Sequence, residues 1–144
     1  MPDAFLLTGN VRVNHDGVVM TCNKAYYFQK ENYIKAFGNV QMVQGDTLFL
    51  NSKYAEYNGN VKKAYASGDA VMSSPDATLE TEIINFDRNT QEVYYDTSGI
   101  ITNKDNTLKS NSGKYYVNHK KFQFLTAVTI TNPTYVIKSN HLDY

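Results

Sequence analysis

The chain has 144 residues, of which 42% are hydrophobic and 19% are charged, and its 14 basic and 14 acidic side chains give a formal net charge of zero. This length corresponds to about one domain, which we expect to span residues 1–144. Zero net charge argues against a nucleic-acid-binding protein, because such proteins carry a basic stripe. A single cysteine, Cys22, excludes an intrachain disulfide and a thiolate metal site.

No apolar run of 18 residues occurs, so the sequence predicts no transmembrane helix. The first residues, Met-Pro-Asp, lack the basic and apolar regions of a signal peptide. If the protein is exported, we therefore expect its signal to have been removed.

The residue types favour β-strands throughout. Twelve Tyr and seven Phe accompany many Val, Ile and Thr, which suit a pleated, half-buried surface, while Gly, Pro, Asn and Asp gather at intervals as in hairpin turns. The sequence predicts about ten antiparallel strands in up-and-down order and no helix. The predicted strands are roughly 4–14, 18–28, 33–43, 48–57, 61–72, 78–86, 91–102, 107–117, 121–131 and 135–144.

Two sequence elements alternate along the chain. In the first, an apolar residue is followed seven positions later by an aromatic one, and successive copies begin 30, 29, 29 and 29 residues apart. Its copies begin at Met20, Leu50, Leu79, Leu108 and Ile137 and end at Tyr27, Tyr57, Phe86, Tyr115 and Tyr144. The second element, Gly-Asn-Val or Gly-Asp-Ala, occurs at 9–11, 38–40 and 68–70, with a weaker copy at Gly99 and a copy at Thr126 that lacks the glycine. Such self-similarity predicts a repeat architecture in which each 29-residue unit is one hairpin.

Each hairpin is expected to bend near its middle. The glycine of the second element permits a bend in its strand. In the neighbouring strand the inward parity slips between Ser52 and Ala55, which predicts a β-bulge there. Stacked bent hairpins predict a jellyroll-like fold of two facing sheets with an apolar interior and open edge strands. Either further repeats continue the native chain, or these edges pair with another molecule.

Catalytic chemistry finds little support in the sequence. His15, His119 and His141 fall in turns or at a variable position, so we expect them to be exposed to solvent. Cys22 aligns with Ser and Thr residues of the other repeats and is interpreted as filling a small-residue slot. The aspartates fall in turns, where Asx hydrogen bonding explains them. We expect no enzyme activity, metal or cofactor, and a β-helix enzyme would need clustered acids that the sequence lacks.

The interior allows two interpretations. Small residues such as Ala36 and Ala66 alternate with larger ones, and they either leave space between the sheets or let the sheets pack closely and dry. Lysines such as Lys35, Lys62–Lys63 and Lys120–Lys121 are expected on a solvated face, with the alternative that some near the mouth meet lipid phosphates.

The alternation of Gly-Asn-Val with Leu-x-Ser-x-x-Ala-x-Tyr, best seen at 36–42 and 50–57, resembles the OstA-like (LptA-type) family of lipopolysaccharide-transport bridge proteins, which is related to the N-terminal domain of LptD. The resemblance implies a periplasmic β-jellyroll without catalytic residues, powered by an ATPase elsewhere. It also implies edge strands that join head to tail with other such modules or with copies of itself, and a groove for the acyl chains of lipopolysaccharide or a related glycolipid.

On this interpretation the lipid would contact the inward-facing apolar side chains. These candidates are Val11, Val13, Met20, Tyr27, Ile34, Val40, Met42, Leu48, Leu50, Tyr57, Met72, Leu79, Phe86, Ile101, Leu108, Tyr115, Val128 and Ile130. The alternative is a structural β-repeat that docks a partner protein by strand addition and holds no ligand.

Overall fold

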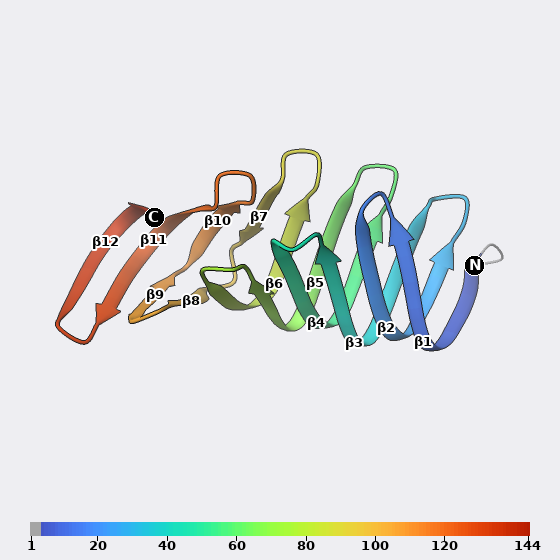
Figure 1. Ribbon diagram of the computed structural model, residues 1–144, viewed down its shortest axis with the longest axis horizontal. Helices are drawn as coiled ribbons and strands as arrows, with labels where there is room; N and C mark the ends of the chain where they lie inside the picture. The colour runs from blue at the N-terminus through green and yellow to red at the C-terminus, as the bar shows by residue number, and fades with distance from the viewer. Residues whose placement is uncertain (1–3) are drawn as a thin grey trace.

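The computed structural model describes residues 4–144 as one antiparallel sheet of twelve strands (Figure 1). The Met1–Asp3 start, on which the expectation about a signal peptide rested, lies outside the described residues. The strands are β1 (Ala4–His15), β2 (Val18–Phe28), β3 (Tyr33–Gln44), β4 (Leu48–Asn58), β5 (Lys63–Ser73), β6 (Thr78–Asp87), β7 (Glu92–Tyr95), β8 (Gly99–Asn103), β9 (Asn106–Ser110), β10 (Ser112–Tyr116), β11 (Lys121–Asn132) and β12 (Tyr135–Asp143). Residues 4–144 contain no helix long and apolar enough to cross a membrane.

The predicted up-and-down order is confirmed, and two of the predicted strands are broken. The segment 91–102 forms β7 and β8, which pair with the two halves of β6, and the segment 107–117 forms β9 and β10, which pair with the two parts of β11. Ten predicted strands therefore become twelve without any change in the order of neighbours.

Every long strand bends near its middle, so the sheet folds into two layers (Figure 1). Layer A contains the half-strands joined by the turns at 16–17, 45–47, 74–77, 104–105 and 133–134. Layer B contains those joined by the turns at 29–32, 59–62, 88–91 and 117–120. The two facing sheets expected from the sequence are thus two layers of a single hydrogen-bonded sheet. We call the side where the turns of both layers approach each other, opposite the bends, the seam.

The bend is built on the Gly-Asn element. Phe37 pairs with Tyr54 and Val40 with Ser52, so Gly38 and Asn39 together lie opposite the single residue Lys53. Gly38 has a φ of 80° and Asn39 a φ of 48°, a conformation that glycine and asparagine tolerate best. The parity slip in β4 is present, but the extra residue of the bulge belongs to the glycine strand β3. The prediction that placed the bulge in β4 was therefore wrong.

The copy that lacks glycine bends in the same way. Thr126 and Ala127 have φ values of 66° and 54°, and the register of β11 with β12 shifts at this point. A β-branched residue in this region is strained. The weak copy at Gly99 serves another purpose, because Gly99 has no positive φ and the positive φ nearby belongs to Ser98.

At most of the bends a side chain on the strand opposite the bulge donates a hydrogen bond back to the bend, the exception being Thr81, which bonds to Thr97 and to the carbonyl of Ser98. Ser52, Ser110 and Ser139 each donate from Oγ to the carbonyl two residues ahead, over 2.8–2.9 Å. Cys22 makes the equivalent contact from Sγ to the carbonyl of Lys24 at 3.3 Å. Cys22 is buried, as its small-residue slot predicts. The residue in this slot thus acts as a hydrogen-bond donor as well as being small.

Candidate functional site: the interior between the layers

All the predicted lipid-contacting side chains lie on the inward faces of the two layers. Sixteen of the eighteen are buried, and the other two, Val13 and Tyr27, pack against the same core while partly exposed. The alternation of inward and outward residues therefore placed these side chains correctly. That any of them binds lipid stays a prediction.

A cavity opens between the layers at the β1 end of the molecule. It has a volume of about 360 Å³, which is near the lower end of the roughly 300–1,000 Å³ typical of ligand pockets. Its apolar wall is formed by Leu7 and by four of the predicted residues, Val13, Tyr27, Ile34 and Tyr57. Its polar rim consists of Arg12, Asn14, His15, Asn32 and Tyr33. Apolar and polar side chains thus share the lining of this cavity.

Beyond this cavity the interior is filled. Met72, Leu79, Phe86 and Leu108 belong to one contiguous cluster, and each is almost completely buried. Protein interiors pack as densely as organic crystals. The sequence left two alternatives, open space between the layers or close packing. The structure has open space near β1 and close packing from the middle of the sheet onward.

Phe122 and Phe124, which the sequence analysis did not single out, close the β12 end together with Tyr115 and Tyr144. Phe122 stacks on Phe124 with ring centroids 5.4 Å apart and tilts against Tyr115 at 4.5 Å. Tyr144 lies 6.5 Å from Phe124, and its hydroxyl accepts a hydrogen bond from Asn103 of layer A at 2.9 Å. This end of the space between the layers is thus closed by side chains from both layers.

Tyr95 is a second buried aromatic that sequence reasoning missed. A Cβ on Gly99 or Gly113 would lie within 2.6–2.8 Å of its ring, so both glycines make room for it. Its hydroxyl forms a short hydrogen bond with Ser110, and burial raises the pKa of the phenol. The parity it shares with Val93 was the signal that could have identified it.

Polar side chains join the two layers along the seam near β1 to β6. The ammonium of Lys62, in layer B, lies 2.9 Å from the carboxylate of Asp16 in layer A. Arg88, in the next layer B turn, donates from Nη2 to the carbonyl of Asp16 at 2.6 Å and from Nε to Oε1 of Gln44 at 3.0 Å. Gln44 also accepts and donates hydrogen bonds with Gln91. These contacts hold turns 16–17 and 45–47 against turns 59–62 and 88–91.

The seam contacts also act on ionisation. The hydrogen bond and charge of Lys62 hold the pKa of the Asp16 carboxyl below its usual value of 3.8. Both side chains remain accessible to water, with 44% of Lys62 and 55% of Asp16 exposed. An exposed pair of this kind contributes little to stability and can exchange partners.

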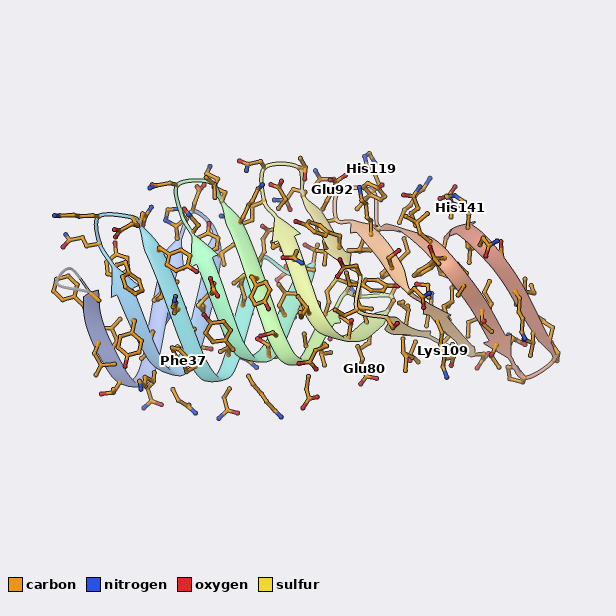
Figure 2. The ribbon with its side chains drawn as sticks, turned by 180° about the vertical axis from the view of Figure 1, so that it is seen from behind. Phe37, Glu80, Glu92, Lys109, His119 and His141 are labelled. Carbon is orange, nitrogen blue, oxygen red and sulfur yellow. The ribbon has the colours of Figure 1, made fainter. Side chains whose placement is uncertain are left out.

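The histidines have separate surroundings and do not form a site. His119, in the turn between β10 and β11, and His141, in β12, are exposed, as expected (Figure 2). His15 is half-buried, which corrects the expectation that it is exposed, because its ring packs 5.5 Å from that of Tyr57 at the cavity rim. Within residues 4–144 no group of three or more His, Cys, Asp or Glu side chains is arranged to hold a metal ion.

Both outer strands of the sheet present apolar side chains to solvent. β1 pairs only with β2 and exposes Phe5 and Leu6, the latter to 56%. β12 pairs only with β11 and exposes Tyr135, Val136 and Ile137, with Val136 at 60%. Unpaired strands with apolar side chains are templates for pairing with another chain.

Comparisons with known proteins agree with this architecture. The crystal structure of LptH, the LptA-homologous periplasmic component of the lipopolysaccharide transport device of Pseudomonas aeruginosa, superimposes with a TM-score of 0.70 at 13% sequence identity. The similarity covers 79% of this chain and 93% of the LptH chain, and it confirms the all-β fold. No match was found among curated protein sequences. A comparison with protein families matches residues 1–140 to the OstA-like proteins, which confirms the resemblance seen in the repeats. Because this match covers nearly the whole chain, the protein belongs to the OstA-like family.

Proposed function

We propose that the chain is a periplasmic module of lipopolysaccharide transport that shelters an acyl chain between its two layers. The OstA-like family is a family of transport components without enzymatic activity, and the LptH whose fold it shares is described as periplasmic. The observation that carries the proposal is the apolar cavity at the β1 end, with its polar rim. An acyl chain there gains about 0.8 kcal/mol per buried CH₂, on the order of 9 kcal/mol for about 12 carbons if fully sheltered.

The size of the cavity limits what the closed module holds. About 360 Å³ accommodates part of a lipid, because a glycolipid with several acyl chains is larger than the drug-sized ligands that such volumes enclose. Fuller occupation of the interior would require the layers to separate. The proposal therefore includes a closed state, in which one chain enters at the β1 end, and a wider state with more lipid inside.

Photo-crosslinking tests the proposal directly. A photoreactive residue replaces Val13 or Tyr27 in the cavity wall, and the purified chain is irradiated with lipopolysaccharide. We expect adducts at both positions and none at the control position Lys109, which is exposed in β9 (Figure 2). Absence of adducts at Val13 and Tyr27, with the variants folded, would refute the carrier function.

We further propose that modules join through their edge strands, β12 of one pairing with β1 of the next or of a related protein. The exposed apolar residues of these strands support this, because pairing would cover them while completing the backbone hydrogen bonds. Such a joint would place the cavity of one module next to the β12 end of its neighbour.

The alternative function is a structural module that docks partners by the same strand addition and carries no ligand. The close packing around Met72, Leu79 and Phe86 favours it, since a filled interior needs no lipid. It predicts association through β1 and β12 without any crosslink in the cavity. The two experiments, crosslinking and association, therefore separate the alternatives.

A further inference from the structure

A cation on one of the seam turns contacts the wall of the apolar cavity. Arg88 donates from Nη1 to the hydroxyl of Tyr57 at 3.0 Å, and Tyr57 is itself part of the cavity wall. Gly17 adjoins the same guanidinium, since a Cβ there would lie 3.8 Å from Nη2. An amphiphile with its tail in the cavity would thus have its headgroup close to this group.

The present hydrogen bonds of Arg88 could be replaced by bonds to an anionic acceptor. The Arg88 side chain donates to three neutral oxygens: the carbonyl of Asp16, the amide of Gln44 and the phenol of Tyr57. A guanidinium is attracted more strongly to an anionic oxygen than to a neutral one, and phosphate matches the fork of the guanidinium. A phosphate arriving at the seam would therefore compete well for Arg88.

Lys62 is a second cation, in the neighbouring turn of layer B. It faces the Asp16 carboxylate across the seam at 2.9 Å, and both groups are accessible to solvent. A phosphate can replace this carboxylate as the partner of Lys62 without burying any charge. The same exchange would remove two links between layers A and B, the Lys62–Asp16 pair and the Arg88–Asp16 hydrogen bond.

We propose that Lys62 and Arg88 form a binding site for the phosphate of an anionic amphiphile, and that occupation of this site breaks their contacts with Asp16 across the seam. The inference rests on the proposed lipid-carrier function and specifies the headgroup that the module selects. In the unliganded protein the two cations hold the turn at Asp16. With ligand they hold the phosphate, and fewer contacts then oppose separation of the layers, the Gln44–Gln91 hydrogen bonds being among those that remain.

The test compares two amphiphiles with the same tail. Binding of dodecyl phosphate and of dodecyl maltoside is measured by calorimetry, below their micellar concentrations, with inorganic phosphate as a third probe. We expect dodecyl phosphate to bind the unmodified chain on the order of tenfold more tightly than the maltoside, as a charge-assisted hydrogen bond predicts. Lys62→Gln combined with Arg88→Gln should abolish this preference, so that the variant binds the two amphiphiles with equal affinity.

A matched control is available at the bends. Lys53 forms an ion pair of the same length, 2.9 Å, with Asp69, and both are exposed on the side away from the seam. Lys53→Gln should leave the preference for phosphate unchanged. Far-UV circular dichroism and urea unfolding establish that each variant is folded before its binding is measured.

Separation of the layers is measured in parallel with spin labels. Cysteines at the exposed turn positions Asp46 and Thr90 carry the labels, in a Cys22→Ser background that mimics the other repeats. We expect dodecyl phosphate to lengthen the distance between labels, and the double seam variant to show a longer or broader distance without ligand. An unchanged distance in both cases would overturn the inference.

The outcomes distinguish this inference from the function on which it rests. If both amphiphiles bind the unmodified chain equally, or the preference survives in the seam variant, the phosphate site is refuted and the lipid carrier stands. If neither amphiphile binds, both are refuted. If inorganic phosphate binds as tightly as dodecyl phosphate, the site is one for free phosphate and the assignment to an amphiphile is wrong.

Discussion

The bends along the sheet allow backbone strain and side-chain crowding to be measured separately. Gly9 and Gly68 both have a positive φ, at 76° and 83°, but their surroundings differ. A Cβ on Gly9 would meet nothing within 4 Å, whereas a Cβ on Gly68 would lie 2.8 Å from the Cβ of Lys53. Because that atom is the fixed base of the side chain, the Lys53 strand itself would have to move.

The expected costs follow from these geometries. In Gly9→Ala the left-handed conformation costs about 1–2 kcal/mol and the more restricted unfolded chain offsets about 0.4–1 kcal/mol, so the free energy of unfolding should fall by about 0.5–1 kcal/mol. Gly68→Ala pays in addition about 1–3 kcal/mol for overpacking. Thr126→Gly reverses the first change and should stabilise by about 0.5–1 kcal/mol, since Thr126 has a φ of 66°.

Urea unfolding followed by tyrosine fluorescence and circular dichroism measures these differences, because the chain contains twelve tyrosines and no tryptophan. For a chain of this size 1 kcal/mol shifts the melting temperature by about 2–4 °C. Equal losses for Gly9→Ala and Gly68→Ala would refute the crowding argument. A destabilised Thr126→Gly would refute the assignment of strain to that bend.

Four further changes test other parts of the structure. Ser52→Ala removes the hydrogen bond to the bend and should cost about 0.5–1.5 kcal/mol in urea unfolding. Phe124→Ala leaves a cavity at a fully buried position and should lower the free energy of unfolding by about 3–5 kcal/mol in the same assay. A much smaller loss would contradict close packing at the β12 end. Since Lys62 lowers the pKa of Asp16, the contribution of this pair to stability is fully present above pH 3.8 and is lost as the pH falls through the lowered value. The free energy of unfolding measured across the acid range should show this loss, and in Lys62→Gln this part of the pH dependence should be absent. Ile137→Pro in the edge strand should shift concentration-dependent oligomers toward monomers in sedimentation velocity, while a parent chain that stays monomeric at high concentration would contradict edge pairing.

The repeats made the order of the strands and the inward residues predictable from sequence. The Gly-Asn element marks a position where the backbone requires a positive φ, so it located the bends at Gly38 and Gly68 directly. The break between β7 and β8 was missed because inward alternation through Val93 and Tyr95 continues up to it. The break itself contains Ser98, whose φ of 59° no glycine announces, and it is followed by Gly99, against which the Tyr95 ring packs.

The seam was beyond the reach of a sequence pattern. Arg88 and Asp16 are 72 positions apart, and their contact depends on how far the turns of one layer lie along the sheet from those of the other. That offset is set by the accumulated twist of the strands between them. The cavity was equally hidden, because the residues that wall it belong to the same repeating series as those that pack tightly elsewhere.

The unequal ends of the space between the layers bear on how cargo would travel along a row of such modules. The mouth beside β1 is hollow, whereas beside β12 the Tyr144 hydroxyl is held by Asn103 in front of Phe124. Joined end to end, the modules would form a row of separate cavities, each closed by Tyr144 on its β12 side, and not one continuous channel. Movement of an acyl chain from one module to the next would have to displace the Tyr144 side chain, which would place a barrier at each transfer.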